Sequence, residues 1–444
     1  MSQKVTLVGG GLAGSLLAIF LAKKGFKVSI YEKRPDMRGS DYEGGRSINL
    51  ALSERGLRAL RKLGLDKEVL DIGIPMRGRM MHDLEGQLKY QPYGHDGQAI
   101  YSVSRGLLNI KLLQMADTME NIEMFFDHDC TGVNLETAET SYTNKAGDAV
   151  EDKADWVIAT DGAYSAVRKA FQMSGRFNYE QKYEDHGYKE LEILANAEGD
   201  FAMNKNCLHI WPRKSFMMIA LPNPDATFTC TVFMPFKGEP GFDDLTTRSE
   251  IEAFVTEQFP DAVPVMPNVL DDFEKNPVGS LVTIRSFPWV RGKTALLGDS
   301  AHAIVPFYGQ GMNCCFEDCS DLDFCLGETN NNMSEALEMY QERRVKNANA
   351  IADLALKNFT EMRDWVGQPE FLARKAIEHD LSELYKDEYK AQYELVTFAD
   401  VTYKEAWDRG FENDRLIDRI IEEKLESKIT DRPFMLNLFK EYLS

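Results

Sequence analysis

The sequence predicts an α/β fold in which a nucleotide-binding domain is interleaved with a β-sheet domain and followed by a helical region. Residues 4–33 read as strand, glycine turn, helix and strand, which together make one βαβ unit. Residues 184–236 read mostly as strands separated by Pro and Asn turns, and the chain beyond Pro369 reads as charged helices with embedded aromatic residues. A chain of 444 residues is also too long for one ordinary compact core.

The remaining elements are assigned in chain order. The first helix is followed by Gly25, where a left-handed residue is commonly needed. We expect strands near 78–90, 122–145 and 294–297 and helices at 53–63, 105–119, 312–327 and 334–366, the last with Ser334 as its N-cap. The predicted nucleotide-binding segments are 1–75, 101–180 and 286–330, the β-sheet segments are 76–100 and 181–285, and the helical region is 331–444.

The charge balance excludes some partners. The chain holds 51 Lys and Arg against 71 Asp and Glu, a formal net charge of −20, which repels nucleic acid. A small anionic ligand would therefore depend on locally placed arginines. We expect a monomer or a homodimer.

Cysteine usage indicates a reducing compartment, and the hydropathy of the chain indicates a protein without a membrane span. The 7 cysteines lack the paired short spacings of a zinc ribbon, and His302 near Cys314, Cys315 and Cys319 makes a poor ligand set, so we expect no metal. The N-terminus shows no signal-peptide pattern, and no apolar run is long enough to cross a bilayer. The apolar end at 433–439 is too short to span one, so we expect a soluble, cytoplasmic protein without a membrane anchor.

A glycine fingerprint follows the first strand directly. Gly9 permits the tight turn, Gly11 lets the backbone approach a pyrophosphate, and Gly14 lets helix and strand pack closely, with Leu12 and Ala13 between them. The helix N-terminus then offers oriented N–H donors to the anion. Glu32 and Lys33 end the second strand, where the Glu32 carboxylate can bind ribose hydroxyls; the alternative for Glu32 is a solvated strand end. FAD and NAD both remain possible at this point.

Two later motifs favour FAD. The run 159–168, ATDGAYSAVR, and the run 297–302, LGDSAH, with Pro306 after it, resemble the Asp-Gly and Gly-Asp motifs of the class A flavoprotein aromatic hydroxylases. The resemblance implies a Rossmann-like FAD-binding domain interleaved with a β-sheet substrate domain, and places Asp299 on the ribityl chain. It implies that these further residues approach the cofactor: Arg46, Arg105, Asp161, Gly162, Gly309, Gly311, Met312 and Asn313.

Within that family, several stretches resemble the kynurenine 3-monooxygenases. They are 45–56, 76–80, 91–94, 186–191, 208–212 and 305–313, and the resemblance spans roughly residues 4 to 400. It implies that Arg79 and Tyr93 bind the carboxylate of L-kynurenine, with Asn358, Glu361 and Tyr393 also at the amino acid end. It further implies an apolar pocket lined by Leu208, Met217, Ile219, Leu221 and Phe233 and closed near the flavin by Phe307 and Tyr308. No residue is singled out as a catalytic acid or base.

The resemblance also implies a reaction. NADPH reduces the bound FAD, O2 forms a flavin C4a-hydroperoxide, and oxygen transfer gives 3-hydroxy-L-kynurenine, a step of tryptophan degradation. A single GxGxxG fingerprint is found, so NADPH is expected to bind transiently. Two alternatives remain open, a flavin hydroxylase acting on another aromatic acid and a non-catalytic dinucleotide-fold carrier. A flavin halogenase is disfavoured because a WxWxI motif is missing.

Overall fold

A six-stranded sheet forms the centre of the first domain in the computed structural model, which describes residues 2–39, 49–94, 97–361 and 369–443. From edge to edge its strands are β18 (Val290–Arg291), β19 (Thr294–Leu296), β12 (Trp156–Ala159), β1 (Lys4–Val8), β2 (Lys27–Tyr31) and β8 (Ile122–Phe125). The pairs from β19 to β8 are parallel. These strands come from chain segments far apart in sequence, so the interleaved architecture is confirmed, although the exact domain bounds stay a prediction.

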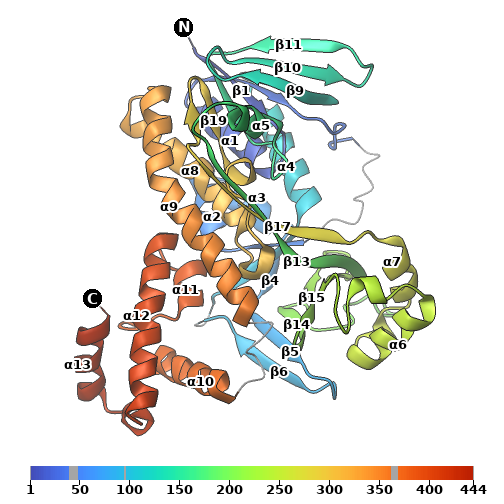
Figure 1. Cartoon of the computed structure of the whole chain (residues 1–444), viewed down its shortest axis with the longest axis vertical. Helices are drawn as coiled ribbons and strands as arrows, with labels where there is room; N and C mark the ends of the chain where they lie inside the picture. Colours follow the sequence, from blue (N-terminus) through green and yellow to red (C-terminus); the bar gives the residue numbers. More distant parts are fainter. Residues whose placement is uncertain (1, 40–48, 95–96, 362–368, 444) are drawn as a thin grey trace.

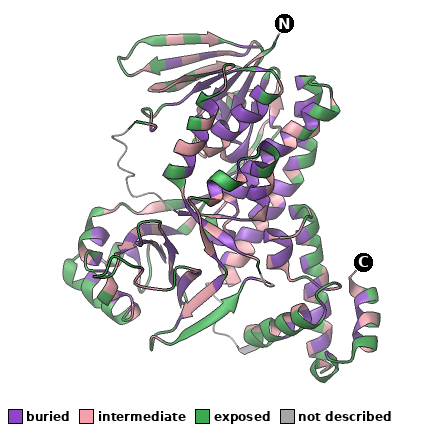
Figure 2. Ribbon diagram, turned by 180° about the vertical axis from the view of Figure 1, so that it is seen from behind, coloured by how far each residue is buried: buried purple, intermediate pink, exposed green. Residues whose placement is uncertain are grey.

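Helices pack on this sheet and build the main core. Helix α1 (Leu12–Lys23) connects β1 to β2, and Gly25 after it has φ +87°, as the sequence predicts. Helices α4 (Arg105–Asp117) and α8 (Gly311–Glu328) pack against α1, and α2 (Glu54–Leu63) packs against α8. Helices α3 (Asp66–Leu70) and α5 (Ala166–Met173) complete the domain, and Figure 2 shows its interior as the largest buried region.

The second domain is a seven-stranded sheet, seen beside α6 and α7 in Figure 1. Its strands in order are β17 (Gly279–Phe287), β13 (Asn178–Ile193), β16 (Phe228–Pro235), β15 (Phe216–Pro222), β14 (Cys207–Arg213), β5 (Gly78–His82) and β6 (Leu88–Pro92). Helices α6 (Arg248–Gln258) and α7 (Val269–Lys275) bury one face of it in a separate apolar cluster. The other face is left for the site described below.

Two three-stranded sheets are smaller. One contains β3 (Asn49–Leu52), β7 (Ile100–Ser104) and β4 (Ile74–Met76), and the other contains β11 (Ala149–Lys153), β10 (Glu139–Asn144) and β9 (His128–Asn134). The first leads directly into α2 and α4, and the second projects from the end of the molecule near the N-terminus (Figure 1).

The C-terminal helices lie along both domains. The long helix α9 (Met333–Thr360) packs on α8, and α10 (Pro369–Leu384), α11 (Gln392–Thr397), α12 (Tyr403–Glu422) and α13 (Arg432–Tyr442) follow at the lower end of the molecule (Figure 1). The prediction of Ser334 as N-cap is wrong, because Asn332 caps α9 by accepting a hydrogen bond from the Glu335 N–H. Within the described ranges, none of the helices has the length and apolar character needed to cross a membrane.

Candidate functional site

The three predicted cofactor motifs meet at one edge of the central sheet. They follow β1, β12 and β19, which are neighbouring parallel strands, so their carboxyl ends lie side by side. The Thr160 hydroxyl donates to the Gly9 carbonyl at 2.8 Å, and a Cβ at Gly14 would lie 2.0 Å from that carbonyl oxygen. A side chain at position 14 would collide with the Gly9 carbonyl and the Thr160 hydroxyl, so only glycine fits there.

Asp161 joins the second motif to the third. Its Oδ1 accepts a hydrogen bond from the Ser300 hydroxyl at 3.0 Å, while its Oδ2 accepts one from the Ala166 N–H at 2.7 Å. Arg168 adds a second link by donating to the Ser300 carbonyl at 2.8 Å. Asp299, next to Ser300, is only half-buried, so its carboxylate remains accessible to a ligand at this edge.

Glu32 is held beside the glycine turn. Its carboxylate accepts the Gly10 N–H at 2.7 Å and the Arg34 N–H at 2.9 Å, and it also pairs with the Arg34 side chain. Burial by itself would raise the pKa of Glu32, but its contacts with Arg34 lower it, so the carboxylate stays ionised. The structure thus supports a buried acceptor at this strand end, and the ribose contact stays a prediction.

Other predicted cofactor residues surround the same edge. Leu12 and Ala13 form the half-buried first turn of α1, while Lys33 and Arg105 are exposed. Arg46 lies outside the described residues. Gly309 and Gly311 flank the start of α8, and Met312 is buried in its first turn. The Asn313 side chain is already occupied, since its amide donates to the Ala51 and Gly309 carbonyls and accepts the Ser53 N–H.

Two of the helices that begin at this edge lack a side-chain cap, whereas α5, which follows the second motif, is capped by Ser165. The N-cap residue is Gly11 in α1 and Gln310 in α8, and in the described chain neither helix has a side-chain cap or an acidic residue in its first turn. The first N–H groups of a helix carry partial positive charge and need an acceptor. Two uncapped helix ends beside the glycine turn fit a long, anionic dinucleotide that contacts both.

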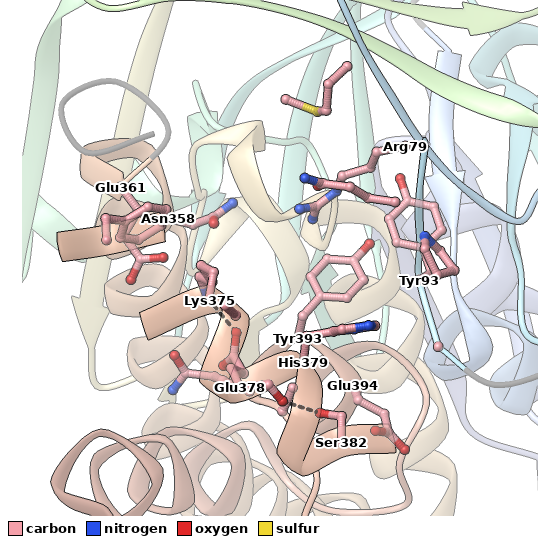
Figure 3. A pocket seen from close by; sticks show the side chains of 18 of the residues that line it. Arg79, Tyr93, Asn358, Glu361, Lys375, Glu378, His379, Ser382, Tyr393 and Glu394 are labelled. Carbon is pink, nitrogen blue, oxygen red and sulfur yellow. Dashed lines mark hydrogen bonds and ion pairs between the residues drawn. The ribbon is translucent and has the colours of Figure 1, made fainter. Parts of the chain in front are cut away.

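A cavity of about 730 Å3 lies between the seven-stranded sheet and the C-terminal helices. Figure 3 shows Arg79 of β5 and Tyr93 facing Tyr393 of α11. The Arg79 guanidinium carbon lies 4.6 Å from the Tyr393 ring centre and 5.4 Å from that of Tyr93. The Tyr393 ring stacks between Tyr93, at 5.2 Å, and Tyr308, at 5.6 Å, so three tyrosines and one arginine form one wall.

Two buried polar atoms of this wall have no hydrogen-bond partner among the described residues. They are Nε of Arg79 and Oη of Tyr93. Burial raises the pKa of Tyr93 well above its usual value, so its hydroxyl keeps its proton and can donate it. An unpaired buried guanidinium nitrogen and a phenol beside a cavity indicate a site for a planar anion such as a carboxylate.

Helix α9 supplies the opposite wall. The Asn358 amide donates to the Phe307 carbonyl at 2.7 Å, and Glu361, one turn later, lines the cavity (Figure 3). Burial raises the pKa of Glu361, although Lys375 and Lys357 oppose the shift. A desolvated carboxylate across the cavity from Arg79 gives the site two poles of opposite charge.

The predicted apolar residues divide into two groups. Met217 and Tyr308 line the cavity. Leu208, Ile219 and Leu221 pack in the cluster behind Tyr93, while Phe233 lies 5.0 Å from Phe307, which stacks on Phe359 at 4.0 Å. The sequence interpretation missed other lining residues, namely Met81, Ile210, Leu354, Lys375, Glu378 and His379. Met81 and Ile210 could have been found from alternation, because they share strand faces with Arg79 and Pro212.

Comparison with known proteins gives the family. Residues 2–355 match the family model described as FAD binding domain. The kynurenine 3-monooxygenase of Myxococcus xanthus is 46% identical over 94% of this chain and 90% of its own length, and that of Dictyostelium discoideum is 42% identical over 100% and 99%. This chain belongs to the kynurenine 3-monooxygenase family. It is an FAD-dependent monooxygenase, and FAD is its cofactor.

A solved structure supports the fold independently. The 2-methyl-3-hydroxypyridine-5-carboxylic acid oxygenase aligns with a TM-score of 0.67 at 20% identity, covering 84% of this chain and 95% of that one. This chain thus shares its fold with that oxygenase although only 20% of the aligned residues are identical.

Proposed function

We propose that this protein hydroxylates L-kynurenine to 3-hydroxy-L-kynurenine, with NADPH as reductant and O2 as the source of oxygen. The observation that carries the proposal is the cavity with unpaired Arg79 and Tyr93 groups at one wall and Glu361 at the other. An α-amino acid carries a carboxylate and an ammonium group close together. Arg79 offers a partner to the carboxylate, and Glu361 offers one to the ammonium group. The names of the family's curated members support the same substrate.

Each wall takes one charged end of the substrate. Arg79 and the Tyr93 hydroxyl bind the carboxylate, and Tyr393 covers it from the C-terminal side. Glu361 and the Asn358 carbonyl oxygen accept hydrogen bonds from the ammonium group. Because Tyr308 and Met217 line the same cavity, the aromatic end extends past them towards Phe307 and the start of α8.

The cofactor occupies the edge where the three motifs meet. Backbone N–H groups after Gly11 would bind the pyrophosphate, Glu32 and Asp299 would bind sugar hydroxyls, and the uncapped N-terminus of α8 would offer N–H donors to the flavin. The reduced flavin supplies an activated oxygen atom when O2 reacts with it. The amino group of the substrate already makes the adjacent ring carbon nucleophilic, so the protein's contribution is orientation and exclusion of water.

NADPH needs no second nucleotide fold in this scheme. The chain has one GxGxxG fingerprint, which the FAD site uses, so the reductant binds only for the reduction step.

One assay tests the proposal. Purified protein with bound FAD is given NADPH and each of L-kynurenine, anthranilate and 4-hydroxybenzoate, and product is identified by mass. We expect kynurenine alone to accelerate NADPH oxidation and to gain one oxygen atom. Faster oxidation with another aromatic acid, and none with kynurenine, would show that the substrate assignment is wrong.

A further inference from the structure

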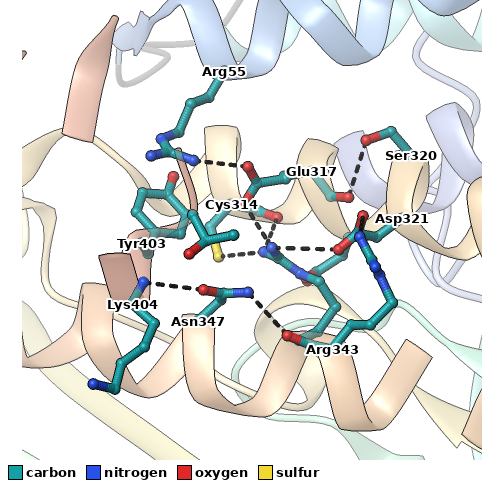
Figure 4. Close-up of polar contacts among 12 residues, drawn as sticks. Arg55, Cys314, Glu317, Ser320, Asp321, Arg343, Asn347, Tyr403 and Lys404 are labelled. Atoms are coloured by element: carbon teal, nitrogen blue, oxygen red, sulfur yellow. Dashed lines mark hydrogen bonds and ion pairs between the residues drawn. The ribbon is translucent and has the colours of Figure 1, made fainter. Parts of the chain in front are cut away.

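A buried chain of charged side chains links α2, α8 and α9. Arg55 Nη1 donates to Glu317 Oε1 at 2.8 Å, and Arg344 Nη1 donates to Glu317 Oε2 at 2.6 Å. Arg344 Nε donates in turn to Asp318 Oδ1 at 2.6 Å. Asp321 Oδ2 lies 3.8 Å from Arg344 Nη1 and adds a third carboxylate, and Figure 4 shows Arg55 and Glu317 joined in this chain. Such a buried chain is tolerated only when each charge is paired.

One end of the chain reaches the third cofactor motif. Asp318 Oδ2 lies 2.6 Å from His302 Nε2 and accepts the Gly298 N–H at 3.2 Å. Gly298 precedes Asp299, the predicted cofactor contact. Within the described ranges, His302, Cys314 and Asp318 are the one group spaced to hold a metal ion, but Arg344 already contacts both Asp318 and the Cys314 sulfur. The polar atoms of this group therefore already have partners within the protein.

The other end reaches the C-terminal helices. Arg55 Nη2 donates to the Val401 carbonyl at 2.6 Å and to that of Leu395 at 3.3 Å, and Nε donates to the carbonyl of Val396. Leu395 and Val396 belong to α11, the helix that carries Tyr393. The Arg55 side chain thus binds carbonyl groups at the C-terminal end of α11, the helix that contains Tyr393.

Tyr403 provides a second connection from the same place. The Arg55 guanidinium carbon lies 4.0 Å from the Tyr403 ring centre, and Tyr403 Oη donates to Gln310 Oε1 at 2.8 Å. Gln310 lies between Gly309 and Gly311, directly before α8, and both Tyr403 and Gln310 are buried. The loop at Gln310 and the end of α11 therefore both contact one Arg–Tyr pair.

We propose that Arg55 and Tyr403 are positioning residues that fix the helix bearing Tyr393 relative to the two cofactor loops at Gly298 and Gln310. An apolar pair could fill the same space, but only directional hydrogen bonds set the register between three separate segments. The consequence for catalysis rests on the proposed function: when the substrate is seated against Tyr393, the flavin loop is held at the matching distance. Loss of this register lets reduced flavin react with O2 before the ring is in place, which yields hydrogen peroxide in place of product.

The test uses two single-hydroxyl deletions in the holoenzyme. Tyr403→Phe removes the bond to Gln310, and Tyr385→Phe removes a comparable buried bond, to the Ile429 carbonyl, in the distal C-terminal cluster. Hydrogen exchange is followed by mass spectrometry in peptides covering 306–311. We expect about fivefold faster exchange there in Tyr403→Phe, the factor for one lost buried hydrogen bond, and no change in Tyr385→Phe. Equal exchange in the two variants would overturn the proposal.

A turnover readout follows the consequence. The fraction of NADPH oxidation that ends as hydrogen peroxide is measured with kynurenine present, together with FAD content. We expect that fraction to rise several-fold in Tyr403→Phe at full FAD occupancy and to stay at the wild-type level in Tyr385→Phe. If wild-type protein shows no kynurenine-stimulated oxidation, the proposed substrate fails while the exchange measurement still decides the positioning role. Arg55→Lys, if it folds, should increase exchange in 306–311 and in 391–401 together.

Discussion

Two arginines of this protein lie over tyrosine rings, and their surroundings differ in an informative way. Arg55 lies over Tyr403 and uses its donors on Glu317 and on backbone carbonyls of the C-terminal helices. Arg79 lies over Tyr393 and forms no ion pair with any carboxylate of the described chain. Burying a guanidinium without an anion is costly, and a bound carboxylate would supply the missing charge. The first arginine therefore has its partners within the protein, and the second is the proposed partner of the substrate carboxylate.

Breaking the buried ion pairs around Arg55 should have the largest effect on stability. Glu317→Leu leaves Arg55 and Arg344 without their shared carboxylate, and loss of one partner from a buried ion pair costs about 3–5 kcal/mol. We expect a large fall in melting temperature, measured by differential scanning fluorimetry. Glu68→Leu, which breaks an exposed pair with Lys111, is the control and should change the melting temperature far less. Similar shifts in both variants would contradict the distinction.

Removing the Arg79 side chain should weaken kynurenine binding and leave the stability of the protein largely unchanged. Arg79→Ala removes the proposed carboxylate partner, and two hydrogen bonds to a charged group are worth about 3 kcal/mol, or roughly 100-fold in affinity. A flavin fluorescence titration with L-kynurenine measures this, with FAD content as the check on folding. Arg77→Ala, at an exposed position in the same segment, should bind normally. Unchanged affinity in Arg79→Ala would remove the carboxylate assignment.

The opposite pole of the cavity should be visible in the pH dependence. Burial raises the pKa of Glu361, so its carboxylate protonates at a higher pH than an ordinary glutamate does. Only the anion pairs with the substrate ammonium, and kynurenine affinity should therefore fall as pH drops through that raised pKa, by up to about tenfold per pH unit. Glu361→Gln should bind more weakly at neutral pH and lose this limb of the profile. A Glu361→Gln profile parallel to the wild type would assign the limb to another group.

The smallest effect is expected from the stacked tyrosine. Tyr393→Phe keeps the ring between Tyr93 and Tyr308 but removes the hydroxyl, which should cost about 1 kcal/mol, or roughly fivefold in kynurenine affinity. The same fluorescence titration applies. Tyr164→Phe, at an exposed position, is the matched control. A loss as large as that of Arg79→Ala would mean that the hydroxyl contributes as much to kynurenine binding as the guanidinium does.

Local patterns were sufficient for most of the elements. Gly9, Gly14 and Gly25 could be interpreted from the sequence because each is demanded by a turn or by a contact with the next strand. The N-cap of α9 was misplaced for a reason of the same local kind. Asn330 and Asn331 adopt positive φ angles of 51° and 64° and complete the turn, so Asn332, two residues before Ser334, becomes the cap. Ser334, an equally good capping residue in isolation, falls inside the helix.

The cavity was only half visible in the sequence. Arg79, Tyr93, Asn358, Glu361 and Tyr393 were named from the family resemblance, and the structure brings all of them to one cavity. Lys375, Glu378 and His379 were missed because charged residues spaced along a helix predict a solvated face as readily as a lined cavity. Their place in the wall depends on how α10 packs, which no local pattern encodes.

The sequence by itself determined the order of elements, the glycine turn, and the three motifs that mark an FAD enzyme, because each depends on backbone geometry within a few residues. Only the tertiary structure decided which charges meet. It separated Arg55, paired with Glu317, from Arg79, whose buried Nε has no hydrogen-bond partner among the described residues, although both are arginines in ordinary elements. The physical reason is that the free energy of a buried charge is set by the partners that distant segments bring to it.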